Sequence, residues 1–312
     1  MPQNSQEKIL VIKLSALGDF VQALGPMKAI KNHHPNAHIT LLTTKMFVPF
    51  GERCGYFDEV WIDERPKALQ ISKWRTLKKK LNSGGFTRVY DLQNNDRTSF
   101  YLKLFPKRRR PEWVGAAKGA SHRNNSPERI AGHALDGHKQ TLALAGIENV
   151  EIDDLSWVNE DLSQFNLQKP FILFVPGSAP QHPQKRWPAD QYAALADYLS
   201  DQKFQVVLLG TDAERDITDK IAASSNDTIN LTGQTSLFQI AALAHQAAGA
   251  VGNDTGPMHM IGPTGCKTLT LFSGHSTPSR HAPKGENVHT LQADNISDLD
   301  IEMVRKKLSE IL

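Results

Sequence analysis

Short runs of β-branched and other apolar residues alternate with helical patterns along most of this chain. The runs at 8–13, 38–43 and 59–62 are each followed by a segment that favours a helix. Alternation at this pace predicts an α/β protein, in which parallel sheets carry helices on both faces. Further strands are expected at 88–92, 171–175, 205–209, 228–231, 247–252 and 268–272, with a short one near Trp113. Helices are expected from Asp19 and from Pro188 onward, at 45–54, 69–81, 212–222 and 236–244, and at the end, where Ile301, Val304, Leu308 and Ile311 share one face.

The length of the chain, 312 residues, exceeds what one hydrophobic core comfortably holds and predicts two domains. Acidic and polar residues without clear periodicity mark a linker near the middle. We therefore expect an N-terminal Rossmann-like domain over 1–150, a linker over 151–168 and a C-terminal Rossmann-like domain over 169–312. Two doubly wound domains in tandem are expected to face each other across a cleft, and such sheets bind ligands outside the carboxyl ends of their strands.

Charge is divided unevenly between the two halves. Residues 1–150 hold 24 Lys and Arg against 13 Asp and Glu, whereas residues 151–312 hold 12 against 20. A basic half could attract nucleic acid, an anionic membrane surface or an acidic small molecule. Solvated, Lys-rich helix faces are the alternative explanation.

Several familiar sites and locations are excluded by pattern. No Gly-x-Gly-x-x-Gly follows a leading strand, and 262–268 resembles a phosphate-binding loop only superficially, because it leads into a strand. The pair Asp298 and Asp300 precedes a helix and is interpreted as a cap, and no histidines have paired ligand spacing, so no metal site is predicted. Two cysteines, no apolar leader and no membrane-length apolar stretch predict a cytoplasmic protein.

The stretch 250–259 is interpreted as a buried strand that breaks into the start of a helix. Asp254 and Thr255 are residue types that cap helix N-termini, and Pro257 suits a first helical turn. Backbone N–H groups and the helix dipole make such a junction favourable for an anionic ligand. By itself, the pattern fits an ordinary capped turn equally well.

Three motifs, taken in order, resemble the signatures of glycosyltransferase family nine, the bacterial lipopolysaccharide heptosyltransferases. They are Lys-Leu-Ser-Ala-Leu-Gly-Asp at 13–19, Pro-Gly-Ser at 176–178 with Lys-Arg-Trp-Pro at 185–188, and Asp-Thr-Gly-Pro-Met-His at 254–259. The resemblance implies a GT-B fold that holds a nucleotide sugar mainly in its C-terminal domain. It also implies an inverting, metal-independent transfer of heptose from ADP-heptose to the anionic lipopolysaccharide inner core.

The resemblance implies catalytic roles for two side chains. Asp19 matches the family's catalytic aspartate and is expected to take the proton of the acceptor hydroxyl as general base, with a helix cap as the other interpretation. Lys185 matches the family's lysine and is expected to stabilise the leaving diphosphate together with backbone donors at Thr255 and Gly256. No metal and no cofactor besides the nucleotide sugar are expected.

The other donor contacts are expected in the C-terminal half. Ser178 is expected at a phosphate, although the prolines at 179–184 depart from the shorter turn of the family. Asp212 or Glu214 is expected to accept hydrogen bonds from the ribose, and both remain candidates. The whole predicted donor set is Ser178, Asp212, Glu214, Gln234, Thr235, Ser236, Asp254, Thr255, Gly256 and His259, with 234–236 beside the adenine and Asp254 contacting the sugar or fixing its loop.

The acceptor is expected to be an anionic, lipid-linked oligosaccharide drawn to the basic N-terminal half. Ser15, Arg97 and Arg123 are the predicted acceptor contacts, and Arg97 is the preferred one. Peripheral contact with the cytoplasmic face of the inner membrane, a monomeric state and no nucleic-acid partner are also expected. The wider basic set is Lys78, Lys79, Lys80, Arg108, Arg109, Arg110 and Arg123.

Three other functions compete with this hypothesis. A protein of the same fold could bind anionic glycans without turnover, or could transfer a sugar from a different nucleotide. A nucleic-acid binder is the third alternative, but only Tyr101, Phe105 and Trp113 lie near the arginine run, which leaves little for base stacking.

Overall fold

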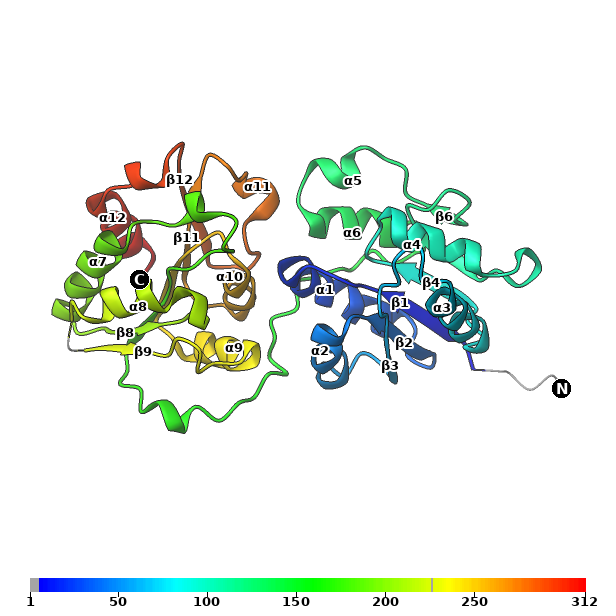
Figure 1. The fold of residues 1–312 in the computed structure, drawn as a ribbon, viewed down its shortest axis with the longest axis horizontal. Coiled ribbons are helices and arrows are strands. Elements are labelled where there is room, and N and C mark those ends of the chain that lie inside the picture. Colours follow the sequence, from blue (N-terminus) through cyan, green and yellow to red (C-terminus); the bar gives the residue numbers. More distant parts are fainter. Residues whose placement is uncertain (1–5, 226) are drawn as a thin grey trace. The chain divides into compact units, whose positions relative to one another are not determined.

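The structure is a computed structural model that describes residues 6–225 and 227–312. It separates into two compact units, Met1–Asp153 and Asp154–Leu312, which we call the N-terminal unit and the C-terminal unit (Figure 1). Each unit contains one six-stranded sheet in which every described pair of neighbouring strands is parallel. This confirms the α/β architecture expected from the alternation of apolar runs and helices.

The sheet of the N-terminal unit has the strand order β3-β2-β1-β4-β5-β6. Leu10 and Ile12 of β1 share a buried cluster with Leu77 and Leu81 of α3. The alternating residue Ile9 is also completely buried, so the central strand is covered on both faces. The strands are β1 (Lys8–Ile12), β2 (His38–Thr43), β3 (Glu59–Ile62), β4 (Arg88–Asp91), β5 (Glu112–Gly115) and β6 (His122–Arg123). The helices are α1 (Leu17–His33), η1 (Lys45–Phe47), α2 (Val48–Arg53), α3 (Ile71–Ser83), α4 (Asp96–Tyr101), η2 (Leu102–Leu104), η3 (Lys107–Arg109), α5 (Glu128–Ala131) and α6 (Ala134–Ala143).

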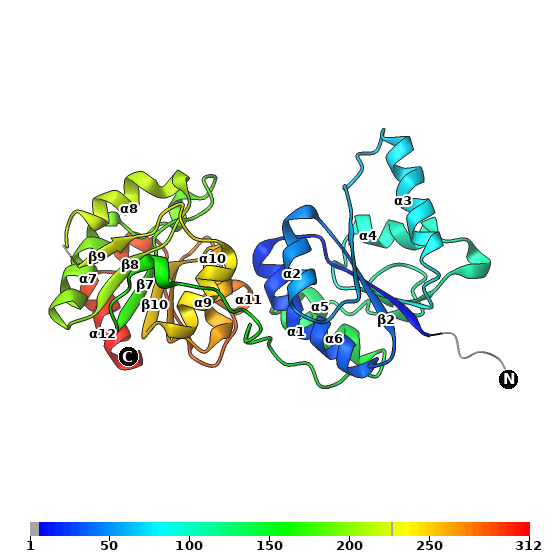
Figure 2. The same cartoon turned by 90° about the horizontal axis from the view of Figure 1, so that it is seen from below.

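The sheet of the C-terminal unit repeats this topology, with the order β12-β11-β10-β7-β8-β9. The strands β7, β8, β9 and β10 of this sheet are labelled in Figure 2. Phe174 of β7 packs in one buried cluster with Leu195 of α7 and with Val304 and Leu308 of α12. The apolar face predicted for the last helix is therefore part of the main core. The strands are β7 (Phe171–Val175), β8 (Gln205–Leu208), β9 (Thr228–Asn230), β10 (Gly249–Asn253), β11 (Thr268–Ser273) and β12 (Val288–Ala293). The helices are η4 (Ser163–Phe165), η5 (Pro183–Lys185), α7 (Ala189–Asp201), η6 (Asp212–Glu214), α8 (Arg215–Ala222), α9 (Leu237–Gln246), α10 (Gly256–Ile261), η7 (Gly262–Thr264), α11 (Pro278–His281), η8 (Ile296–Asp298) and α12 (Ile301–Ile311).

Two predicted helix caps are present. The Ser236 hydroxyl accepts a hydrogen bond from Gln239 N at 3.1 Å, and the Gln239 side chain accepts one from Ser236 N at 2.9 Å. Asp300 accepts a hydrogen bond from Met303 N at 2.8 Å at the start of α12. The interpretation of the Asp298 and Asp300 pair as a cap is thereby confirmed for Asp300.

The elements without a predicted counterpart include the strands β6 and β12 and the helix α6. The side chains of the edge strand β12 are only partly buried and include His289 and Thr290, so no apolar run marks it. The strand β6 is only two residues long. The helix α6 buries His138 and Thr141 as well as leucines, which weakens its helical pattern of apolar residues.

Candidate functional site

The strand order of each sheet reverses beside its first strand, between β1 and β4 in one unit and between β7 and β10 in the other. At such a switch point, crossovers leave in opposite directions and open a crevice at the carboxyl ends of the strands. The motif at 13–19 follows β1, the motif at 176–188 follows β7, and the motif at 254–259 follows β10. All three motifs therefore lie at the ligand-binding edges of their own sheets.

Asn253, the last residue of β10, ties the switch point of the C-terminal unit together. Its side chain is completely buried and donates a hydrogen bond from Nδ2 to Pro176 O at 2.7 Å. Its Oδ1 accepts hydrogen bonds from Trp187 N and from Tyr192 Oη, both at 3.1 Å. The loop after β7 and the start of α7 are thus fixed to the end of β10. The sequence prediction ended the strand at Gly252 and placed Asn253 in the loop that follows, so it missed this role.

Lys185 and Asp254 form an ion pair at this edge. Lys185 Nζ lies 2.7 Å from Asp254 Oδ2, and the exposed fractions of the two side chains are 20% and 9%. The Ser276 hydroxyl donates a second hydrogen bond to the same carboxylate oxygen at 2.6 Å. Gln292 of β12 in turn donates to Ser276 O at 2.9 Å. Ser276 was not predicted, because it lies in a segment without regular pattern, far from both motifs in sequence.

The Ser178 hydroxyl is engaged within its own loop. It donates a hydrogen bond to His182 O at 2.8 Å and accepts one from Arg186 Nε at 3.1 Å. Arg186 Nη2 donates a further bond to Ser178 O at 3.0 Å. Arg186 therefore holds the turn that carries Lys185.

The junction between β10 and α10 depends on a close approach of strand and helix. A Cβ atom at Gly252 would lie 2.4 Å from Met258 Sδ and 2.8 Å from Val175 Cβ, so glycine is required there. Thr255 is the N-cap residue of α10, without a capping bond from its side chain, and Gly256 begins the helix. Thr255 and Gly256 are partly exposed, whereas His259 is buried on the same helix.

The two acidic candidates for the ribose differ in surroundings. Glu214 is buried and its Oε2 accepts hydrogen bonds from Thr211 N and Thr211 Oγ1, at 2.9 and 2.6 Å. A Cβ atom at Gly177 would lie 2.6 Å from Glu214 Cγ, so this side chain lies against the loop after β7. Asp212 is exposed and forms an ion pair with Arg215.

The residues predicted beside the adenine follow β9, the outermost strand of the sheet next to β8. Gln234 is exposed and donates to Asn230 O at 3.0 Å, and Thr235 is partly buried. The Ser236 hydroxyl is engaged in capping α9.

At the switch point of the N-terminal unit, the loop after β1 is held by a residue that follows β4. Gln93 Oε1 accepts hydrogen bonds from Leu14 N at 2.9 Å and from Ser15 N at 3.1 Å. Asp19, in the first turn of α1, is exposed, and its Oδ2 accepts a long hydrogen bond of 3.5 Å from Ala16 N. The carboxylate thus approaches the start of its own helix while remaining open to solvent.

Ionisable groups are buried beneath this loop. Burial lowers the pKa of Lys13, whose Nζ donates to Leu92 O at 3.3 Å. Burial raises the pKa of Asp91 to about 6, although hydrogen bonds from the backbone of Asn94 and Gln93 oppose the shift. Burial and nearby Lys13 lower the pKa of His138 to about 3. None of these three residues was among the predicted site residues. The pairing of β1 with β4 brings Lys13 and Asp91 together, and that pairing cannot be read from the local sequence.

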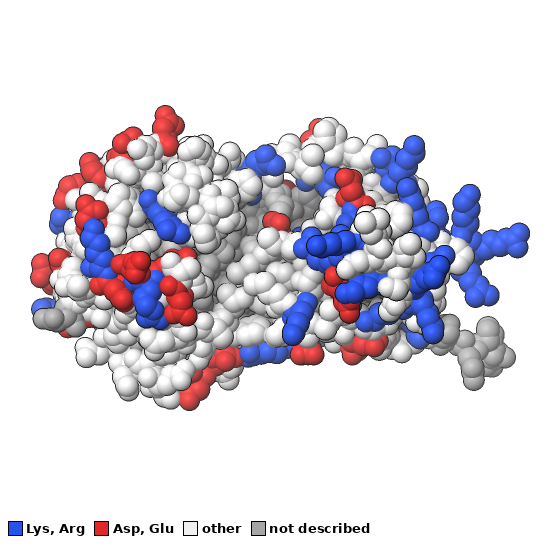
Figure 3. Space-filling model, in the orientation of Figure 1, with Lys and Arg blue, Asp and Glu red and all other residues white. Residues whose placement is uncertain are grey.

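The two predicted acceptor arginines lie on different elements of the N-terminal unit. Arg97 of α4 donates to Pro66 O at 3.2 Å and lies 5.8 Å from the centre of the Trp74 ring. Arg123 is exposed on the edge strand β6. Figure 3 shows Lys and Arg gathered over the N-terminal unit, at the right of the view, and a larger share of Asp and Glu over the C-terminal unit.

None of the helices in the described part of the chain is both long and apolar enough to cross a membrane. Within residues 6–225 and 227–312, no group of three or more His, Cys, Asp and Glu residues could hold a metal ion.

Known proteins resemble this chain over nearly its whole length. It is 27% identical over 309 residues to lipopolysaccharide heptosyltransferase 2 of Escherichia coli (strain K12), covering 91% of this chain and 88% of that protein. A solved family 9 glycosyl transferase from Veillonella parvula has a TM-score of 0.83 at 22% identity, covering 98% of this chain and 97% of the other. The E. coli ADP-heptose lps heptosyltransferase II has a TM-score of 0.74 at 22% identity, covering 97% and 98%. The predicted GT-B class of fold is thereby confirmed.

The family model of glycosyltransferase family 9 (heptosyltransferase) matches residues 74–308. This match includes the loop after β7, the ion pair of Lys185 with Asp254 and the start of α10. The chain therefore belongs to glycosyltransferase family 9, the heptosyltransferase family.

Proposed function

We propose that this protein transfers heptose from ADP-heptose to the lipopolysaccharide inner core with inversion at the anomeric carbon. Membership of family 9 and the likeness to a lipopolysaccharide heptosyltransferase support the substrate class. The single observation that supports the chemistry most is the ion pair of Lys185 with Asp254 at the switch point of the C-terminal sheet. A partly exposed cation at this edge suits an anionic diphosphate.

In the proposed reaction, the Asp19 carboxylate takes the proton of an acceptor hydroxyl. The acceptor oxygen then forms a bond to the anomeric carbon of the sugar, while the bond from that carbon to the diphosphate oxygen breaks on the opposite face. ADP leaves with the electron pair of the broken bond. The exposed position of Asp19 in the first turn of α1 supports this role, because an acceptor hydroxyl can reach the carboxylate.

The developing charge on the leaving diphosphate is stabilised by Lys185 Nζ and by backbone N–H groups of Thr255 and Gly256. Asp254 Oδ2 orients the lysine, and Asp254 Oδ1 accepts hydrogen bonds from hydroxyl groups of the donor sugar. Ser178 acts through Arg186 and the turn rather than as a direct phosphate ligand, since its hydroxyl is already engaged on both sides.

Nucleotide contacts are assigned to the outer strands of the C-terminal sheet. We assign the ribose to Glu214 rather than Asp212, because Glu214 lies against Gly177 of the phosphate loop. The adenine is assigned to residues 234–236 through their backbone atoms, and His259 to support of α10 from within the core. The acceptor is assigned to Ser15, Arg97 and Arg123.

The decisive experiment compares Asp19→Asn with Asp136→Asn. Asp136 is the matched control, because it is also an exposed aspartate at the third position of a helix in the same unit. We expect Asp19→Asn to lower kcat by about 100-fold or more while the Kd for ADP stays within about twofold, and Asp136→Asn to change neither. Comparable loss of transfer and ADP binding in Asp19→Asn would overturn the assignment of the base.

A second measurement separates the proposal from a different donor or a non-catalytic glycan binder. Thermal unfolding is recorded with ADP, UDP, GDP and CMP, and ADP is expected to raise Tm most. Preference for UDP would overturn the ADP-heptose assignment. The absence of product with ADP-heptose and a lipopolysaccharide core acceptor would support the glycan-binding alternative instead.

A further inference from the structure

A groove runs along α3 of the N-terminal unit, between that helix and residues 96–109. At the beginning of α3 the groove widens into a largely apolar hollow of about 580 Å³. Trp74, Phe100 and Leu104 line it, together with Pro66 of the loop before α3. Leu104 and Trp74 also pack with the core cluster of the N-terminal sheet, so the hollow opens at the edge of that core, and Pro66 and Phe100 extend its apolar lining outward.

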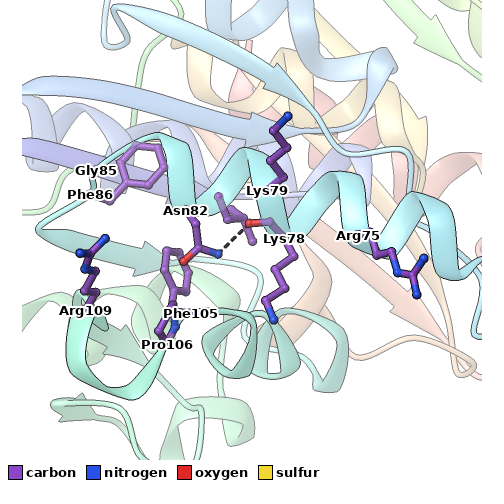
Figure 4. A pocket seen from close by; sticks show the side chains of 10 residues that line it. Arg75, Lys78, Lys79, Asn82, Gly85, Phe86, Phe105, Pro106 and Arg109 are labelled. Atoms are coloured by element: carbon purple, nitrogen blue, oxygen red, sulfur yellow. Dashed lines mark hydrogen bonds between the residues drawn. The ribbon is translucent and has the colours of Figure 1, made fainter.

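Towards the end of α3 the same groove becomes basic. A hollow of about 670 Å³ is lined there by Arg75, Lys78, Lys79 and Arg109, with Phe105 on the neighbouring segment. Figure 4 shows Arg75 and Lys78 extending from α3 towards the side of Phe105, and Lys79 extending the other way. The consecutive residues Leu104 and Phe105 line the apolar and the basic hollow respectively, so the two adjoin.

Large apolar side chains are exposed in the loop before α3, at the first residue of α3 and on α4. Leu69 is 94% exposed and Ile71 is 62% exposed, and Phe100 beside the apolar hollow is 43% exposed. Figure 2 shows α3 and this loop projecting from the rest of the N-terminal unit. Exposed apolar side chains that cluster in this way mark an interaction surface, whereas isolated ones need no explanation.

The apolar tip is held in place by hydrogen bonds. Trp74 Nε1 donates to Lys67 O at 3.1 Å, and Arg97 Nη1 donates to Pro66 O at 3.2 Å. Lys67 N donates to the side chain of Gln70 at 2.9 Å. These hydrogen bonds fix the conformation of the loop that exposes Leu69.

We propose that this α3 surface docks the protein on an anionic lipid bilayer. Leu69 and Ile71 enter the boundary between headgroups and acyl chains, while Arg75, Lys78 and Arg109 lie over lipid phosphates. A bilayer offers negative charge and an apolar interior side by side, which matches the two adjoining parts of the surface. A nucleic acid or a soluble anionic glycan would match the cations but would leave the apolar tip in water.

The place of this surface in the fold connects it with the proposed reaction. The loop that carries Leu69 follows the carboxyl end of β3, and Asp19 follows the carboxyl end of β1 in the same parallel sheet. Docking through the tip therefore presents the edge with Asp19 to the bilayer. This inference deepens the proposed function and rests on it only for the lipid-linked nature of the acceptor.

The test is flotation of the full-length protein with vesicles of phosphatidylcholine, with or without phosphatidylglycerol. These vesicles contain no glycan acceptor, so binding reports docking alone. We expect binding only to the vesicles that contain phosphatidylglycerol, with weakening at high salt. The double variant Leu69→Ser/Ile71→Ser is expected to bind at least about tenfold more weakly, because it removes apolar side chains that enter the boundary.

Charge is tested by Arg75→Glu/Lys78→Glu, which should also lower binding and remove most of its salt dependence. Matched controls lie in the C-terminal unit: Met303→Ser replaces a methionine that is 45% exposed, and Lys220→Glu/Lys306→Glu reverses two exposed lysines. Both controls should bind like the wild type. An unchanged Tm in every variant shows that folding is not the cause.

The proposal is overturned if the wild type fails to float with anionic vesicles, or if the tip variant binds as well as Met303→Ser. It is also overturned if neutral and anionic vesicles bind the protein equally. Transfer to a soluble, delipidated core acceptor separates this proposal from the proposed function. The variant Leu69→Ser/Ile71→Ser should keep that transfer. A wild-type protein that binds vesicles but shows no transfer would count against the enzyme assignment alone.

Discussion

Lys185 Nζ and Asp254 Oδ2 lie 2.7 Å apart, although 69 residues separate them in sequence. The lysine comes from the loop after β7 and the aspartate from the loop after β10, two strands that are neighbours only because the sheet reverses its order there. The pair therefore joins the two motifs of the C-terminal unit in one site. The carboxylate fixes the position of the ammonium before any ligand arrives.

We expect Lys185→Ala to lower kcat by about 100-fold, because one preorganised cation at the leaving group is lost. Lys185→Arg should recover part of this loss, since the charge remains but its geometry changes. Steady-state kinetics with the nucleotide sugar provides the measurement. Lys220→Ala, which alters an exposed lysine of α8, is the control and should leave kcat unchanged. A wild-type kcat in Lys185→Ala would remove the lysine from the mechanism.

Ser276→Ala tests whether Asp254 is itself held in place. The variant deletes a 2.6 Å hydrogen bond to the carboxylate, so Asp254 and with it Lys185 should become less well oriented. We expect kcat/KM for the donor to fall roughly tenfold with little change in Tm. Ser279→Ala on α11 changes an exposed serine and should have no effect. If both serine variants behave alike, Ser276 has no positioning role.

Asn253→Ala is expected to destabilise the C-terminal unit. The change leaves Pro176 O, Trp187 N and Tyr192 Oη without their buried partner, so the free energy of unfolding should fall by about 3 kcal/mol or more. The midpoint of urea unfolding measures the effect. Asn287→Ala, at an exposed asparagine, should shift that midpoint little. An equal response of the two variants would contradict the role assigned to Asn253.

His138 should make the N-terminal unit less stable as the pH falls. Its pKa is about 3 in the folded chain against 6.5 for the free side chain, with burial as the main cause. Below pH 6.5 the unfolded chain takes up this proton and the folded chain does not, so stability should fall by roughly 1 kcal/mol per pH unit until the folded pKa is reached. Urea unfolding of His138→Asn should show a smaller loss of stability over this range.

Asp91 should act in the opposite direction over part of the same range. Burial raises its pKa from 3.8 to about 6, so the folded chain keeps a proton that the unfolded chain releases. Its contribution is fully present below pH 3.8 and is lost as the pH rises through about 6. Asp91→Asn should therefore lose stability more steeply than the wild type on acidification between these values. Parallel curves for wild type, His138→Asn and Asp91→Asn would contradict both assignments.

The pattern of residue types within short segments predicted most of the strands and helices and the start of α9. The apolar run at 8–13, the capping box at Ser236 and the break after Asn253 each carry their structure within a few residues. The motifs also lie, as expected, in loops after the carboxyl ends of β1, β7 and β10, because they follow apolar runs that form parallel strands. The edge strand β12 escaped prediction because one of its faces is polar and partly solvated.

The contacts between distant segments could not be predicted in this way. Ser276 follows β11 and meets Asp254 only because β11 pairs with β10, and Lys13 and Asp91 share a buried site only because β1 pairs with β4. Strand pairing decides these contacts, and it is not encoded in the spacing of residue types. The inward position of Glu214, by contrast, follows from the local Thr-x-x-Glu capping box at 211–214, a signal that the sequence prediction did not use.

The hydrogen bonds of Asn253 have a consequence for the thermodynamics of donor binding. Both polar atoms of this side chain have partners within the folded chain, so the loop after β7 and the start of α7 are ordered when the C-terminal unit folds. The conformational entropy of that region is therefore lost when the chain folds and not when the donor binds. Donor affinity then carries no penalty for organising the loop, and the affinity should depend little on loop flexibility.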